Sequence, residues 1–341
     1  MLLSDLTQLP GVSGCEDAVR NYIYENIKAK CDEITFDSIG NMTALMRGTG
    51  NLRKKVLLCA HMDEIGMITS RITDDGFLKF KTVGGIDPRV MVSKRVLVGN
   101  GSVPGVIGYK AVHLQEKSER ETTAKSKSLY IDIGAKNKKD AEKRVKIGDC
   151  IVFDSEYRKF GDDLIKARAL DDRAGCAILT ELCGCRFDFD LYICFTVQEE
   201  VGLRGAKILA NRINPDLALV IESTTCSDVY GTEPEDYSTE LGKGVALSII
   251  DRTTYYNKEL TQFIYKLAQD NGIPIQYKKT AMGGNEAGAI HLACGGVKTA
   301  ALSIPARYIH SPSSVISKKD FDSCAKLVHL FLKEADKCLN Y

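Results

Sequence analysis

The 341-residue chain lacks the features that mark a membrane or secreted protein. No apolar run approaches the ~20 residues that are needed to span a bilayer. Residues 1–5 show no basic segment leading into a long apolar stretch, so we expect no signal peptide. The net charge is only +1, which gives no electrostatic reason to expect binding to nucleic acid or to an anionic membrane. We therefore expect a cytoplasmic protein with neither of these partners.

Cysteine is present in number but follows no recognisable pattern. The twelve cysteines are scattered along the chain, and no Cys-x-x-Cys pair occurs. In a chain of this size without a secretory signal, reduced thiols are expected rather than a disulfide framework.

Four apolar runs each lead to residues that are able to bind a metal. These runs are 56–60 before His61, 191–197 before Glu199 and Glu200, 217–221 before Glu222, and 299–304 before His310. Continuous apolar runs separated by helical segments are typical of buried parallel strands. Because such sheets carry their chemistry beyond the carboxyl ends of the strands, we expect these side chains at one edge of one sheet.

The chain changes character after about residue 70. From there to about residue 160 the apolar runs are short and partly alternating, and Asn100-Gly101 between two such runs predicts a β-hairpin. Short strands at this spacing favour a small β-barrel. The sequence thus predicts an α/β catalytic domain, 1–69 and 163–341, with a mostly parallel sheet flanked by helices. A β-barrel domain, 70–162, is inserted into it.

The residues around His61 and Asp171 allow two interpretations each. A single histidine after a strand is more often structural, but Asp63 follows in extended chain and could hold the second ring nitrogen of a metal-bound His61. The Asp171-Asp172 pair could cap the start of a helix. It could equally hold a carboxylate rigidly between two cations.

The Glu199-Glu200 pair is a sharper signal. Adjacent carboxylates beyond a strand repel each other unless a cation or a proton intervenes. One of them can bind metal while the other takes a proton from an activated water. Glu222 and His310 are weak signals individually, but five compatible positions at one predicted sheet edge indicate a dinuclear metal site.

Four motifs resemble those of one enzyme family. They are HMDEIG from residue 61, ALDDRAG from residue 169, EEVGLRG from residue 199 and RYIHSP from residue 307. In this order they resemble the dinuclear metallo-aminopeptidases that include glutamyl aminopeptidase, the deblocking aminopeptidases and the tetrahedral TET peptidases. The resemblance covers essentially the whole chain, including the insert, which mediates dimerisation in that family. Some relatives carry an endoglucanase label, but this site resembles a peptidase site.

The resemblance implies a role for each candidate residue. Asp171 would bridge two divalent ions, zinc or cobalt first and manganese as a compatible third. Glu200 and His310 would complete one metal site, and His61 and Glu222 the other. Glu199 would be the general base, Asp63 would orient His61, and Asp172 would follow a cis peptide bond.

The sequence departs from the family pattern at two places. Glu222 stands where many members carry Asp, and Gly284-Asn285-Glu286 stands where Gly-Thr-Asp is common. We expect an aminopeptidase that acts on short peptides and assembles as a homodimer or a tetrahedral dodecamer. The alternatives are an amidase or deacylase acting on N-acylated small molecules, and a non-catalytic assembly protein.

Overall fold

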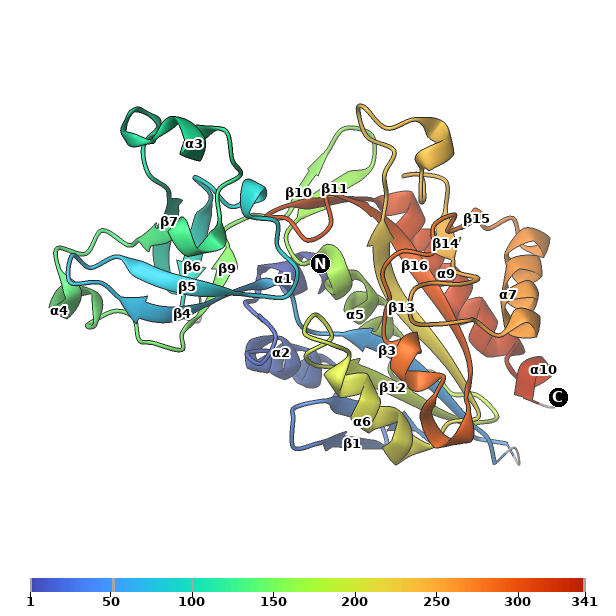
Figure 1. Cartoon of the computed structure of the whole chain (residues 1–341). Helices are drawn as coiled ribbons and strands as arrows, with labels where there is room; N and C mark the ends of the chain where they lie inside the picture. The colour runs from blue at the N-terminus through green and yellow to red at the C-terminus, as the bar shows by residue number, and fades with distance from the viewer. Residues whose placement is uncertain (1, 51–52, 100, 340–341) are drawn as a thin grey trace.

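The computed structural model describes residues 2–50, 53–99 and 101–339. It contains a large α/β part and a separate β part that extends from one side of it (Figure 1). Asn100, at the predicted hairpin turn, lies outside the described residues. The two strands of that hairpin, β6 (Arg95–Val98) and β7 (Val103–Gly108), pair antiparallel as predicted.

The four predicted apolar runs form the centre of an eleven-stranded sheet. They are the strands β3 (Lys55–His61), β12 (Asp190–Thr196), β13 (Leu217–Thr225) and β16 (Lys298–Arg307). These four lie side by side and parallel in the order β12-β3-β13-β16. Their carboxyl ends therefore meet at one edge, as the sequence predicted.

The outer strands make the sheet mixed, and the predicted α/β fold is confirmed with this qualification. β2 (Met42–Met46) pairs antiparallel with β12, and β17 (Ser314–Ser317) pairs antiparallel with β16. Short connections such as the one from β16 to β17 allow antiparallel pairing, whereas parallel neighbours need long crossovers. The remaining strands are β1 (Glu33–Phe36), β10 (Arg158–Phe160), β11 (Leu164–Ala167), β14 (Val245–Leu247) and β15 (Ile275–Tyr277).

Helices cover both faces of the sheet because its central strands are apolar on both faces. Along β3, Val56 and Leu58 pack into one core cluster, while Leu57 and Cys59 pack into another on the opposite face. The first face carries α1 (Leu2–Gln8), α2 (Asp17–Ile27), α5 (Leu170–Leu182), α7 (Lys258–Asp270) and α9 (Lys318–Glu334), with α10 (Asp336–Leu339) at its end. The second carries α6 (Arg204–Ile213) and α8 (Ala287–Ile290).

The β part is a closed barrel with its own apolar core, in the strand order β4-β5-β8-β7-β6-β9. Its further strands are β4 (Gly66–Ile72), β5 (Leu78–Val83), β8 (Tyr130–Asp132) and β9 (Cys150–Phe153), and the short helices α3 (Lys117–Arg120) and α4 (Lys138–Ala141) connect them. The predicted insert, 70–162, overlaps this barrel. However, β4 already begins at Gly66, and β10 belongs to the central sheet.

One disulfide bond joins the two parts. Cys15, in the turn before α2, is bonded to Cys150 on β9. The expectation of fully reduced thiols is therefore wrong for this pair, because the fold brings together cysteines that are 135 positions apart. Among the described residues, no helix is both long and apolar enough to cross a membrane.

A buried cluster of charges fixes the start of the chain against the central strands. The Glu64 carboxylate accepts hydrogen bonds from Arg168 Nη1 at 2.7 and 2.8 Å and from Arg173 Nη2 at 3.2 Å. Glu64 and Arg168 are each 3% exposed, and Arg173 is fully buried. Arg173 also donates to Leu6 O, so the cluster connects α1 to the ends of β3 and α5.

We expect Glu64→Leu to lower the free energy of unfolding by about 3–5 kcal/mol, because two buried guanidinium groups would lose the carboxylate that they share. Urea denaturation in the presence of a chelator measures this change. Lys54→Ala is the control, since the Lys54–Asp216 pair is largely exposed and contributes about 0–1 kcal/mol. A loss for Glu64→Leu no larger than that of the control would contradict the prediction.

Candidate active site

His61 and the Asp171 carboxylate form the centre of a first cluster at the sheet edge. His61, the last residue of β3, places Nε2 3.2 Å from Asp171 Oδ1 and 3.3 Å from Glu222 Oε1. Glu222 lies on β13, beside β3, so the parallel pairing brings these two side chains together. His61 is 1% exposed, and its other ring nitrogen, Nδ1, lies 3.1 Å from Asp63 O and 3.4 Å from Asp63 Oδ1.

The second oxygen of Asp171 faces a second cluster. His310 Nε2 lies 3.5 Å from Asp171 Oδ2 and 3.2 Å from Glu200 Oε2. His310 follows the end of β16, and Glu200 follows the end of β12. Asp171 thus presents one oxygen to each histidine, which is the arrangement that a carboxylate shared between two cations requires.

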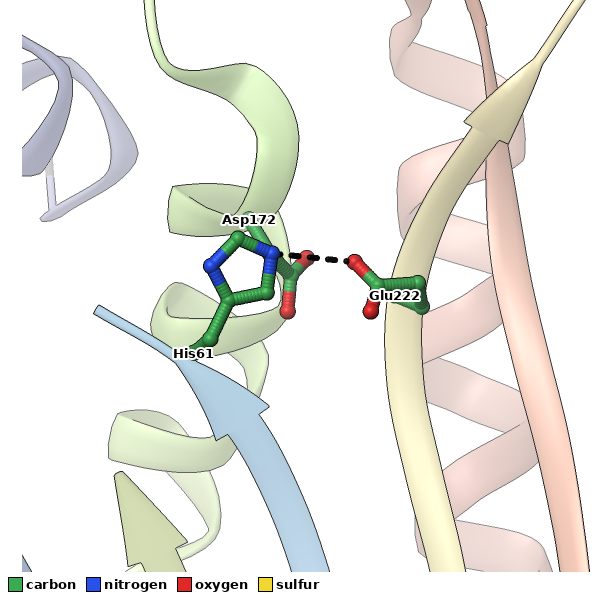
Figure 2. Close-up of side chains that lie close together, drawn as sticks. All are labelled: His61, Asp172 and Glu222. Atoms are coloured by element: carbon green, nitrogen blue, oxygen red, sulfur yellow. Dashed lines mark ion pairs between the residues drawn. The ribbon is translucent and has the colours of Figure 1, made fainter. Parts of the chain in front are cut away.

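Asp172, which was not among the five predicted ligands, joins the first cluster. Figure 2 shows the side chains of His61, Asp172 and Glu222 directed toward one another from β3, α5 and β13. Potential ligand atoms of these three residues lie within 4.8 Å of one another, as do those of Asp171, Glu200 and His310. The Asp171–Asp172 peptide bond is cis, as the resemblance implied.

The interpretation of the Asp171-Asp172 pair as a helix cap holds for Asp172 and not for Asp171. Asp172 Oδ1 accepts a hydrogen bond from Gly175 N at 3.0 Å, in the first regular turn of α5. The backbone at Asp171 is not helical, and its carboxylate remains directed at the two histidines. Asp172 Oδ2 is buried and has no hydrogen-bond partner among the described residues.

Asp63 holds the backbone of the Glu199-Glu200 pair. Its Oδ1 accepts a hydrogen bond from Glu199 N at 3.0 Å and its Oδ2 one from Glu200 N at 3.1 Å. Oδ2 also accepts the hydroxyl of Ser13 at 2.6 Å. These donors and His61 lower the pKa of Asp63 against the opposing effect of its burial, so it remains a carboxylate.

Two further side chains hold the residues just before the acidic pair, and the sequence predicted neither role. Asn41 Oδ1 accepts from Val197 N at 3.0 Å, and Glu16 Oε1 accepts from Gln198 N at 3.1 Å. Four consecutive N–H groups, 197–200, thus end on side-chain oxygens from distant segments. The fit is close, since a Cβ at Gly205 would lie 2.3 Å from Asn41 Oδ1.

Burial and the opposite charges of the acids and the histidines determine the pKa values of the two clusters. Burial raises the pKa of Glu200 to about 7 and that of Glu222 to about 8, and it also raises the pKa of Glu199. Burial opposes protonation of His310, but Asp171 and Glu200 outweigh it and raise the pKa of His310 to about 9. Similarly, Glu222 and Asp171 raise the pKa of His61 despite its burial. Protonated forms of these residues would have to release their protons before they could bind a cation.

The glycine-rich loop at 283–288 lies beside the clusters, but its acid faces away from them. Gly283, Gly284 and Asn285 line the same cavity as His61 and His310. Glu286, in contrast, is fully buried and accepts a hydrogen bond from Cys59 Sγ at 2.8 Å. The Asn285 side chain donates to the Tyr256 hydroxyl at 3.0 Å. Of the two residues that depart from the family pattern here, Asn285 lies at the cavity wall and Glu286 lies away from it.

An α/β sheet that gathers histidines and acids beyond its parallel strands is typical of metal-dependent hydrolases. The chain belongs to the M42 glutamyl aminopeptidase family, whose model matches residues 40–327. An Acetivibrio thermocellus protein assigned to the aminopeptidases is 40% identical, over 96% of each chain. The TET aminopeptidase of a Thaumarchaeota archaeon is 34% identical, with a TM-score of 0.94 over 99% of this chain and 98% of its own.

The resemblance to the TET peptidases is thereby confirmed, and this protein is a metallo-aminopeptidase. The Pyrococcus horikoshii TET1 peptidase, which can assemble into a tetrahedron or a large octahedral shell, is 35% identical with a TM-score of 0.86 over 97% of this chain and 98% of its own. A Thermotoga maritima protein named as an endoglucanase is also 35% identical, with a TM-score of 0.83 over 99% of both chains. The endoglucanase label therefore does occur among relatives of this chain.

Relatives of nearly equal similarity are named for opposite substrates. The lysyl aminopeptidase of Pyrococcus furiosus is 30% identical over 98% of this chain and 96% of its own length. The glutamyl aminopeptidase of Lactococcus lactis is 31% identical over 93% of this chain and 90% of its own. Overall similarity therefore does not decide which N-terminal residue this protein prefers.

Proposed function

We propose that this protein removes residues one at a time from the N-termini of short peptides, using two divalent cations per chain. The observation that carries the proposal is the placement of Asp171, whose two oxygens face His61 and His310 separately. His61 and Glu222 would hold one cation and His310 and Glu200 the other, with Asp171 shared. Zinc or cobalt suits these nitrogen and carboxylate ligands, and manganese is compatible.

The side chains fit such ions. Glu200 Oε1 and Asp172 Oδ2 are buried without a hydrogen-bond partner among the described residues, which is costly unless a cation is nearby. Three carboxylates close to His61 would repel one another as anions. Asp172 could bind the first cation directly, or it could stabilise the cation through its charge without contact. Glu222, the neighbouring ligand, is one methylene longer than the Asp that many family members carry at this position.

The geometry of the acidic pair supports different roles for Glu199 and Glu200. Cations held in the clusters would supply Lewis-acid chemistry, polarising the scissile carbonyl and making water a better nucleophile. Glu199 lines the cavity with His61 and His310, whereas Glu200 Oε2 is directed at His310. Glu199 would accept the proton of the attacking water and pass it to the leaving amine. Asp63 would hold Glu199, Glu200 and His61 in fixed positions relative to one another.

Assembly and location are part of the same proposal. We infer that the barrel mediates a homodimer and that dimers build a closed shell, because such assemblies are known for the P. horikoshii relative and closed symmetry is usual for soluble oligomers. We also propose that the substrates are peptides, that neither nucleic acid nor a membrane is a partner, and that the protein is located in the cytosol.

The first test concerns the need for a free N-terminus. The carboxylates of Glu199 and Glu222 line the cavity and can bind an α-ammonium group, whereas an acetylated terminus offers no charge to them. Digestion of a peptide of about ten residues should release single amino acids in order from the N-terminus, as mass spectrometry would show. The acetylated peptide should react far more slowly. Early internal fragments would contradict the proposal, and equal rates on both peptides would favour an amidase.

The second test separates the base from the ligand. Glu199→Gln should reduce kcat by roughly 10²-fold or more while keeping the metal content, because the amide cannot accept a proton. Glu200→Gln should instead lose metal, measured by elemental analysis after reloading with zinc or cobalt. The wild-type protein should approach two ions per chain. If Glu199→Gln lost metal and Glu200→Gln lost only activity, the two roles would be reversed. If the wild-type protein bound no metal, the proposed mechanism would be wrong.

The third test concerns assembly. Light scattering should give a dimer, or a dodecamer of twelve 37.5 kDa chains. A strict monomer at micromolar concentration would show that the barrel does not mediate association in this protein.

A further inference from the structure

The cavity beside the two clusters has a volume of about 620 Å³, and most of its lining residues are polar or charged. Its hydroxyl side chains are Ser223, Thr224, Thr225, Ser227, Ser238, Thr280 and Ser303. Among the described residues that line it, only Met282 and Ile309 are large and apolar.

Lys278 is the only lysine or arginine among the described residues that line this cavity. It follows β15 directly, and its backbone N donates to Leu247 O at 3.1 Å, which fixes its place at the edge of the sheet. The side chain is partly buried, and burial lowers its pKa while Asp251, Glu222 and Asp171 act in the opposite direction. Lys278 thus lines the same cavity as His61 and Glu222.

Lys278 nevertheless forms no ion pair with a described residue, and the nearby carboxylates have other partners. Asp251 Oδ1 accepts the N–H groups of Thr253 and Thr254, both at 2.8 Å, and Asp251 Oδ2 accepts the Tyr256 hydroxyl at 2.5 Å. Asp171 and Glu222 face His61. Once cations neutralise these two carboxylates, a partly buried ammonium group remains without a counter-ion, which is unfavourable.

We propose that Lys278 selects peptides with an N-terminal glutamate or aspartate by binding the side-chain carboxylate. This inference rests on the proposed aminopeptidase function, which places the N-terminal residue of the substrate in the cavity beside Glu199. The carboxylate would provide the missing counter-ion, and the surrounding hydroxyl groups can donate further hydrogen bonds to it. Glu199 and the exposed Asp236 are the only other charged groups of the cavity outside the two clusters and Lys278, again among the described residues.

Aminoacyl anilides test this inference, since they carry no C-terminal carboxylate that could bind Lys278 instead. The metal-loaded enzyme should hydrolyse the glutamyl anilide with a kcat/KM about 10- to 100-fold above that of the glutaminyl anilide, the magnitude expected of a charge-assisted hydrogen bond. Lys278→Met removes the charge and keeps most of the side-chain length. It should reduce the glutamyl-to-glutaminyl ratio to near one. Free glutamate should likewise inhibit the wild type more strongly than glutamine does.

Lys279→Met is the matched control, because the exposed Lys279 lies outside the cavity and contacts Glu240 at 3.9 Å. It should keep the wild-type ratio. A wild type that cleaves glutaminyl, leucyl or lysyl anilides at least as well as the glutamyl one would overturn the inference and leave the aminopeptidase function intact. So would an unchanged ratio in a folded Lys278→Met variant. Hydrolysis of no anilide at all would instead overturn the proposed function as well.

Discussion

In the proposed mechanism the adjacent carboxylates of Glu199 and Glu200 have different roles, and the backbone that carries them must therefore be fixed. The protein meets this constraint with side-chain acceptors for four successive N–H groups, the last two on Asp63. Because Asp63 also faces His61 Nδ1, one carboxylate sets both the orientation of a histidine and the divergence of the two acids. Movement of the β3 end would disturb both clusters together.

The buried Glu64 cluster supports the same strand end from the other side. Arg173 donates to Met62 O, between His61 and Asp63, and to Leu6 O in α1. Arg173 also lies two residues after Asp171, so its guanidinium ties the shared carboxylate to the strand that carries His61. A buried ion pair of this kind contributes little net stability compared with apolar packing. Its value here is that it fixes the relative position of two segments that carry the site.

The sequence could predict the centre of the fold because the signals there are local. Each apolar run marked one central strand, and the polar residue after each run lies at the shared edge, as with Glu222 after β13. The direction of the outer strands and the Cys15–Cys150 bond depend on contacts between distant segments, and no local pattern encodes them. Glu16 was missed for the same reason: it acts by accepting a backbone N–H from 182 positions away.

The barrel also forms part of the active-site surroundings. β4 begins three residues after Asp63, so the strand that carries His61 leads almost directly into the barrel. The loop after β5 packs on the second cluster: a Cβ at Gly84 would lie 3.3 Å from Glu200 Cβ, and one at Gly85 3.5 Å from His310 Nδ1. The disulfide adds a third connection, because Cys15 lies directly before Glu16. A barrel held by a partner subunit would thus hold the histidines and the acidic pair through three separate attachments.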